Sequence, residues 1–464
     1  MKSKDIGLQF VSVLLVKISF LLLFPWSNEF YKSSIAYAAG DTFSYYPPLE
    51  SLLNNGHYFD DFRMPGLAFP YLFLRFLMNE TMALNALVII QVFFSAISVI
   101  LLAKITLILT GKKSLYYWVL ALYGLSTFVT KYDNVLLTES LFTSTLILVV
   151  YLLIQEGKKR FLIIGLLLAW MVFLKPISIL LIPIIISVFI YKEYKTIRKF
   201  DVRIALIAAP ILLLLSVWVL RNYKEHNRFF LLTKSVNYPS VESSYLSHAY
   251  EFVASFGGSC VYWKPKAEIT FFYKASNSNV EECHYFPNYI YTSKFNRDSL
   301  LDLKQLIQKI DDSKDLILKE TLNGKAEKAF DRYKQSIIDE KPFLYHVGSR
   351  FLLLKSFLIH PGTMNLFLKA SNKLTPFELL VKIGYSLVYL FSVFAGFLGI
   401  LFFSFRKKQS NLFWLILPAT YFALIYPLVM RMDEFRYYVP AYPFMLVLGF
   451  LFVNHFVMSL RKKR

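Results

Sequence analysis

The residues best suited to chemistry near the start of the chain lie in one polar, aromatic stretch that follows the first long apolar run. This stretch holds the carboxylate Asp41, the guanidinium Arg63, and the adjacent phenols Tyr45 and Tyr46. A carboxylate at a membrane surface can take a proton from a hydroxyl or an amine, and an arginine can bind an anion. The structural alternative makes Asp41 a helix N-cap and Arg63 an interfacial anchor.

Two further acids follow in the next polar segment. Glu139 begins an apolar run in the order Thr-Glu-Ser-Leu-Phe, and Asp133 lies six residues before it. An acid that enters a membrane is costly, so it should face the interior of a helix bundle or water. Asp133 competes with Glu139 for a catalytic role, and the structural alternative for Glu139 is an acid that meets a helix dipole.

Basic residues beside the apolar runs could bind an anion, because cations stabilise negative charge. Five are candidates: Arg63, Lys131, Lys175, Arg221 and Arg436. Asn222 follows one of them, and Glu434 and Tyr437 flank another. The alternative for each basic residue is an anchor whose head group reaches the interface, and Glu434 could simply pair with Arg436.

The composition indicates a membrane protein that crosses the bilayer several times. Of 464 residues, 56% are hydrophobic and 18% charged, with a mean hydropathy of +0.47. A soluble protein would carry about 25% charged residues. The net charge of +20 fits basic loops on the cytoplasmic side. Membrane lipid is therefore an expected partner, and the absence of any nucleic-acid motif argues against nucleic acid.

Metal and nucleotide motifs are absent from the sequence. The seven histidines form no His-x-x-His or His-x-x-x-His pair, and no Walker or Rossmann glycine pattern occurs. We therefore expect no cofactor and no metal, although a carboxylate pair could still hold a divalent cation.

The apolar runs predict an all-α polytopic fold with about 10 membrane helices, within a range of 10–13. The expected spans are 8–26, 83–109, 114–130, 136–155, 161–175, 176–191, 203–220, 379–405, 411–430 and 439–460. The segment 66–78 is either a half-buried helix or a further span. With the N-terminus in the cytoplasm, every basic cluster beside a span falls on one side. The prediction is a multi-pass protein of the plasma (inner) membrane with both termini cytoplasmic and the candidate site residues on the external (periplasmic) face.

Three regions follow from this topology. Residues 1–220 form a membrane module with a first external loop at 27–82, residues 221–378 a large external segment, and residues 379–464 the last spans. The external segment contains Cys260 and Cys283, whose location on an oxidising side makes a disulfide a candidate and two free thiols the alternative. Within it, 299–340 has the spacing of amphipathic helices, and 342–360 is apolar enough to return to the membrane.

Several motifs together resemble the GT-C membrane glycosyltransferases. The first loop resembles that of the protein O-mannosyltransferase and aminoarabinose-transferase branch, although this branch usually has Arg-Pro-Pro-Gly-Tyr-Pro where this chain has Arg63-Met-Pro-Gly-Leu-Ala-Phe-Pro70. The matching elements are Gly40-Asp41, Asn54-x-Gly56-x-Tyr58, Arg63-x-Pro65-Gly66, Thr138-Glu139-Ser140, Lys175-Pro176, Arg221-Asn222-Tyr223 and Glu434-x-Arg436-Tyr437. They occur in the family's order across the membrane portion, and the external segment is not covered.

The resemblance implies a GT-C fold and transfer of a sugar, with inversion, from a polyprenyl-phosphate donor to a lipid, glycan or protein acceptor. It implies Asp41 as the general base, Glu139 as a residue that orients Arg63 or the acceptor, and the basic residues as the phosphate site, without a metal. Two other functions stay open. One is a polysaccharide polymerase or ligase that uses a lipid-diphosphate donor. The other is a transporter of lipid-linked sugars, for which the expected inverted halves and paired broken helices are not found.

Overall fold

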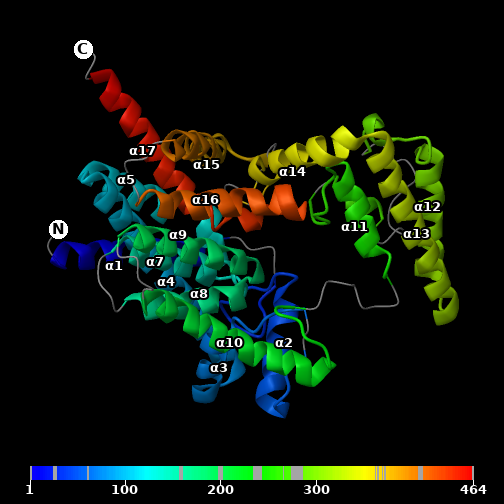
Figure 1. Cartoon of the computed structure of the whole chain (residues 1–464), viewed down its shortest axis with the longest axis horizontal. Helices are drawn as coiled ribbons and strands as arrows, with labels where there is room; N and C mark the ends of the chain where they lie inside the picture. Colours follow the sequence, from blue (N-terminus) through cyan, green and yellow to red (C-terminus); the bar gives the residue numbers. More distant parts are fainter. Residues whose placement is uncertain are drawn as a thin grey trace. The chain divides into compact units, whose positions relative to one another are not determined.

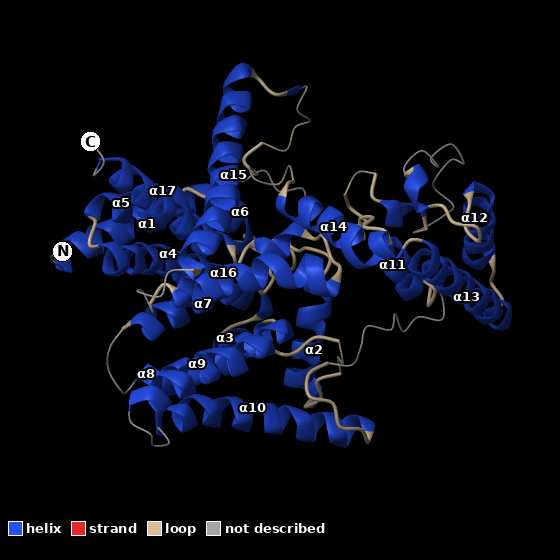
Figure 2. Cartoon of the chain, turned by 45° about the horizontal axis from the view of Figure 1, so that its top comes forward, coloured by secondary structure: helices blue, strands red, loops and turns tan. Residues whose placement is uncertain are grey.

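The computed structural model describes most of the chain, in two compact units that we treat separately. The described residues are 3–24, 29–59, 62–155, 160–196, 202–233, 243–264, 266–272, 286–360, 362, 365–367, 369, 373–405 and 411–461. Unit 1 comprises residues 1–234, 361–421 and 439–464, and unit 2 comprises 235–360 and 422–438. Within the described residues the chain forms helices and loops, and the only strand-like pairing is at isolated bridges (Figure 2).

Unit 1 contains the apolar helices (Figure 1). They are α1 (Ser3–Leu23), α2 (Thr42–Asn55), α3 (Ala68–Leu77), α4 (Glu80–Thr110), α5 (Lys113–Gly124), α6 (Thr127–Thr130), η1 (Lys131–Asp133), α7 (Glu139–Ile154), α8 (Arg160–Leu174), η2 (Pro176–Leu180), α9 (Leu181–Thr196), α10 (Val202–His226), α15 (Pro376–Ser404), α16 (Phe413–Leu424, whose last three residues belong to unit 2) and α17 (Tyr442–Arg461).

Unit 2 is a smaller helical body with an aromatic core. Its elements are α11 (Leu246–Ser255), η3 (Glu268–Phe271), η6 (Asn288–Ile290), α12 (Arg297–Asp312), α13 (Leu316–Glu340), η7 (Leu344–Gly348), α14 (Ser349–Leu358), η9 (Ile425–Met430) and η10 (Phe435–Tyr438). Helices α12 and α13 lie side by side (Figure 1), and Phe252 packs its ring 4.9 Å from that of Phe295. The amphipathic helices expected over 299–340 are confirmed.

The described residues include six helices that are long and apolar enough to cross a membrane. They are Asp5–Leu23, Glu80–Thr110, Arg203–His226, Pro376–Ser404, Phe413–Met430 and Tyr442–Arg461. These coincide with six of the predicted spans, and the all-α polytopic membrane fold is confirmed. Three other expected spans correspond to shorter apolar helices: α7 at 136–155, α8 at 161–175 and η2–α9 at 176–191. The expected span at 114–130 is divided into the two helices α5 and α6.

The segment 66–78 contains the ten-residue helix α3. At 1.5 Å per residue such a helix is about 15 Å long, about half of what a bilayer core requires. Glu50 of α2 holds it through two hydrogen bonds from Arg75, at 2.8 and 3.1 Å, and through one from the Tyr71 hydroxyl at 2.5 Å. The helix therefore braces the first loop instead of adding a span.

Glycines allow two membrane helices, α15 and α17, to approach closely. A Cβ on Gly399 would lie 2.6 Å from the carbonyl oxygen of Leu448, and one on Gly396 would lie 2.8 Å from that of Met445. Small residues of this kind are how membrane helices pack without a hydrophobic driving force between them.

Candidate active site

Asp41 forms an ion pair with Arg63 at the start of α2. Arg63 Nη2 lies 2.7 Å from Asp41 Oδ1, and the side chains are 17% and 27% exposed, respectively. Asp41 occupies the N-cap position of α2, but its side chain makes no capping hydrogen bond. The Asp41 carboxylate is thus accessible and is held by the Arg63 guanidinium. It does not act as the helix N-cap that the structural alternative expected.

The residues around Arg63 fix its guanidinium in place. Its Nε donates to Ser44 Oγ at 3.0 Å, and its charge lies over the rings of Tyr45 and Phe62 at 4.9 and 4.4 Å. The Tyr58 hydroxyl donates to the Arg63 carbonyl oxygen at 2.9 Å. These contacts orient both side chains of the ion pair before any substrate arrives.

Glu139 and Lys175 form a second, more deeply buried ion pair. Lys175 Nζ lies 2.8 Å from Glu139 Oε1, and the side chains are 8% and 3% exposed, respectively. Glu139 is the first residue of α7, and Lys175 lies between α8 and η2. Lys175 is therefore the ion-pair partner of Glu139, whereas the sequence led us to expect Glu139 to orient Arg63 or the acceptor.

Backbone pairing brings the first polar loop against the segment that leads to Glu139. Tyr37 N donates to the Asn134 carbonyl at 3.0 Å, and Leu136 N donates back to the Tyr37 carbonyl at 2.9 Å. The Thr42 hydroxyl, one residue after Asp41, donates to the Leu136 carbonyl at 3.1 Å. Residues about 100 positions apart in sequence thus become neighbours.

Tyr45 lies near the acids of both ion pairs, with its ring beneath the Arg63 guanidinium. Its hydroxyl has Thr138 as a hydrogen-bond partner and experiences the charges of Arg63, Glu139 and Asp41. Burial raises the pKa of Tyr45, and Glu139 and Asp41 raise it further while Arg63 opposes them. The phenol therefore stays protonated at neutral pH.

The Arg-x-Pro-Gly segment packs directly on the end of α8, next to Lys175. Trp170 Nε1 donates to the Gly66 carbonyl at 2.8 Å. A Cβ on Gly66 would lie 2.3 Å from the Phe173 carbonyl oxygen and 2.4 Å from the Leu174 nitrogen. The position thus requires glycine because two backbones meet there.

We expect Gly66→Ala to destabilise the protein by about 1–3 kcal/mol, the usual cost of overpacking, because only a backbone shift can relieve the contact. Denaturant unfolding of the purified protein in detergent measures this change. Gly384→Ala is the matched control, because no atom lies within 4 Å of its added Cβ. Equal stability of the two variants would contradict the close approach.

Asp133, the rival acid, is engaged elsewhere. Its Oδ2 lies 2.9 Å from Lys17 Nζ and its Oδ1 accepts from Ser140 Oγ at 2.6 Å. Lys17 also donates to Thr130 Oγ1 at 3.0 Å, and the side chains of Lys17 and Asp133 are 1% and 2% exposed. This buried network fits a structural role and leaves Glu139 as the better acid for the site.

Tyr46 and Lys131, two other predicted site residues, contact aromatic rings outside the two ion pairs. The Tyr46 ring is fully buried and packs edge-on against Tyr71, with centroids 5.1 Å apart. Lys131 places its ammonium over the neighbouring Tyr132 ring at 5.6 Å. Neither contact joins the two ion pairs, so Tyr46 supports α2 against α3.

Arg221 reaches the first loop from α10. Its Nη2 donates to the Tyr58 carbonyl, and its guanidinium lies over the rings of Tyr58 and Trp218 at 5.6 and 5.1 Å. Asn222 accepts from Arg221 Nη1 at 3.1 Å and donates to the Phe230 carbonyl at 3.0 Å. Arg221 thus has a link through Tyr58 to Arg63, whereas Asn222 anchors the chain that follows α10.

Glu434, Arg436 and Tyr437 belong to unit 2 and contact one another. Glu434 and Arg436 form an ion pair, and Arg436 Nη2 donates to the Tyr437 hydroxyl at 3.2 Å. The mutual pairing is the structural alternative stated above. Of the disulfide candidates, Cys260 is described and its thiol contacts the Tyr250 carbonyl at 3.5 Å, whereas Cys283 lies outside the described residues.

Two residues near the site were not singled out from the sequence. Lys17 is a lysine inside the first apolar run, a position typical of a functional or paired charge, and this signal could have identified it. Gln91 of α4 donates through Nε2 to the Asp133 and Val135 carbonyls at 2.8 and 3.2 Å. No pattern in the sequence marks this glutamine as a residue with a role. Among the described residues no group of three or more His, Cys, Asp or Glu is placed to hold a metal ion.

Comparisons with known proteins give one structural likeness. No family model and no curated protein matches the chain. Among solved structures, the chain is similar to the archaeal oligosaccharyltransferase AglB from Archaeoglobus fulgidus in complex with an inhibitory peptide and a dolichol-phosphate. The identity is 12% and the TM-score 0.45, with 99% of this chain and 52% of that chain covered, so this chain spans about half of that protein's length.

Proposed function

We propose that this protein is an integral-membrane glycosyltransferase of GT-C type. It moves a sugar from a polyprenyl-phosphate donor to an acceptor at the external face of the plasma membrane, with inversion at the anomeric carbon. The observation that carries the proposal is the arrangement of two acid–base pairs, Asp41–Arg63 and Glu139–Lys175, around the phenol of Tyr45.

Asp41 is the general base of the proposed reaction. Its carboxylate takes the proton from the acceptor hydroxyl or amine, whose lone pair attacks the anomeric carbon. The bond from that carbon to the phosphate oxygen breaks, and the polyprenyl phosphate leaves with the electron pair. The exposure of Asp41, larger than that of Glu139, supports its assignment as the carboxylate that meets the acceptor.

Arg63 has two tasks in this scheme. In the absence of substrate it pairs with the Asp41 carboxylate, and with donor bound its guanidinium is shared with the phosphate. The hydrogen bond to Ser44 and the two aromatic rings beside it keep it in place. Lys175, paired with Glu139, supplies a second positive charge to the proposed site.

Arg221 contributes to donor binding through the fork of its guanidinium. We expect Arg221→Lys to raise the KM for the donor about tenfold, which corresponds to about 1.4 kcal/mol for one lost charged hydrogen bond. A lysine has a single ammonium and cannot contact Tyr58, Asn222 and a phosphate together.

Initial rates at varied donor concentration give this KM. Arg228→Lys is the control, because Arg228 is exposed on the same stretch of chain. An unchanged KM in Arg221→Lys would remove Arg221 from the donor site.

The reaction class is tested with purified full-length protein and synthetic lipid donors. Monophosphate-linked sugars are compared with diphosphate-linked sugars of the same polyprenol, and release of the lipid product is measured with lipid, glycan and peptide acceptors. Acceptor-dependent release of polyprenyl phosphate supports the proposal. Release only from diphosphate donors would instead establish the polymerase or ligase function, and movement of intact donor across the bilayer without release would establish a transporter.

A further inference from the structure

The helical segment 342–358 of unit 2 has two apolar faces, one covered and one open. It consists of a helical turn, the π-helical segment η7 and helix α14. Ser349, Leu353 and Phe357, spaced four residues apart, are fully buried against the unit. This face attaches the segment firmly to unit 2.

The open face carries large apolar side chains at the same spacing. Phe343 is 74%, Val347 37% and Phe351 64% exposed. Leu352 and Ile359 are exposed beside them. An apolar helix face left open by the rest of its unit is suited to contact with protein or with lipid.

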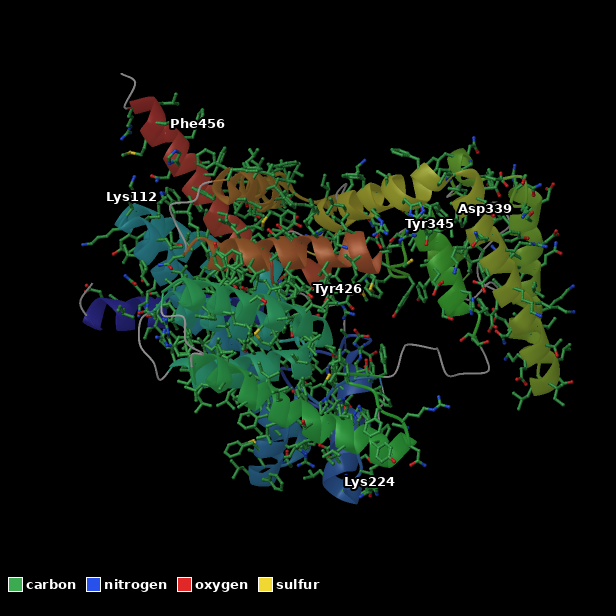
Figure 3. All side chains as sticks on the ribbon, in the orientation of Figure 1. Lys112, Lys224, Asp339, Tyr345, Tyr426 and Phe456 are labelled. Carbon is green, nitrogen blue, oxygen red and sulfur yellow. The ribbon has the colours of Figure 1, made fainter. Side chains whose placement is uncertain are left out.

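The covered face contacts the end of a membrane span. Residues 425–430 complete the candidate span Phe413–Met430 and belong to the same unit as α14. Arg350 Nη1 donates to the Leu428 carbonyl, and the Phe357 and Tyr426 rings stack with centroids 6.4 Å apart. Tyr345 and Tyr426, labelled in Figure 3, mark the two segments. Because α14 packs on the last turns of a span, it lies at the depth of the membrane surface.

The charge of this region complements an anionic surface. From residue 341 to residue 360, all within unit 2, the sequence contains no acidic residue and three basic ones: Lys341, Arg350 and Lys355. Basic residues beside an apolar helical face are typical of helices that lie in the interface between head groups and acyl chains.

We propose that the segment 342–358 is an interfacial helix that lies in the plane of the membrane. Phe343, Val347 and Phe351 enter the acyl boundary, and the exposed Lys355 reaches the lipid phosphates. The helix thereby fixes unit 2 to the bilayer independently of the chemistry proposed for unit 1.

The test uses full-length protein in nanodiscs that contain phosphatidylglycerol. p-Acetylphenylalanine replaces Phe351 and carries a nitroxide, which leaves the native cysteines untouched. The same substitution at Lys328, an exposed position on α13 of the same unit, is the matched control. Collision rates with oxygen, which concentrates in lipid, and with a water-soluble nickel chelate are measured for both.

We expect the label at position 351 to collide preferentially with oxygen and the label at 328 with the nickel chelate. A label at 351 as accessible to nickel as that at 328 would overturn the proposal, and so would one shielded from both reagents, which indicates coverage by protein such as a second copy. As a second check, Phe351→Glu should shift a label at position 343 toward the nickel chelate; no shift there would also count against a lipid-embedded face.

Discussion

Asp41→Asn should lower the turnover number by about 10²–10⁴-fold, the range that general base catalysis contributes. Asparagine has nearly the same shape and can still accept a hydrogen bond from Arg63, so the fold of the first loop and donor binding should be retained. The amide cannot take a proton from the acceptor, however. Single-turnover release of polyprenyl phosphate, with donor binding measured on the same preparation, separates these two effects.

The control for this variant is Asp298→Asn, which changes an exposed aspartate in the first turn of α12. It should leave turnover unchanged. Full turnover in a folded Asp41→Asn protein would remove Asp41 from the role of base and would make Glu139 the acid to test next.

Lys17→Met should destabilise the protein by about 3–5 kcal/mol, the usual cost of leaving one partner of a buried ion pair without the other. The reason is that the buried Asp133 carboxylate loses the ammonium of Lys17, which also donates a hydrogen bond to Thr130. The carboxylate must then be protonated or reach water. Denaturant unfolding in mixed micelles measures the change in free energy of unfolding.

A double-mutant cycle tests whether the pair is the cause. Lys17→Met combined with Asp133→Leu removes both charges, so the double variant should recover most of the loss. Lys113→Met, at an exposed lysine where α5 begins, should change stability little. A double variant that is less stable than Lys17→Met alone would show that Lys17 acts through other contacts.

The sequence predicted the helical membrane fold well because its main determinant is local. Six long apolar runs appear as six long helices, and the amphipathic spacing over 299–340 appears as α12 and α13. The lengths of the individual helices were harder to predict. The apolar run at 114–130 is interrupted near Ser126, and the segment 66–78 contains only the ten-residue helix α3. The apolar content of a segment does not show whether it forms a short helix held by hydrogen bonds to Glu50, as α3 does, or a helix that crosses the bilayer.

Within the site, the residue types were predictable and the pairs were not. Asp41, Arg63, Glu139 and Lys175 stood out as charges at the ends of apolar runs. Which acid meets which base depends on the pairing of Tyr37 with residues near position 135, and this contact joins segments about 100 residues apart. Lys17 and Asp133 show the same difficulty, because their contact also depends on how distant helices pack.

The most direct test of the account is a cryo-EM map of the full-length protein in nanodiscs with polyprenyl phosphate, the proposed product, bound. We expect the phosphate to contact Arg63, this guanidinium to be shared between Asp41 and the phosphate, and Tyr45 to lie beside them. A phosphate bound elsewhere, with the Asp41–Arg63 pair unchanged, would contradict the assignment of these two ion pairs as the active site.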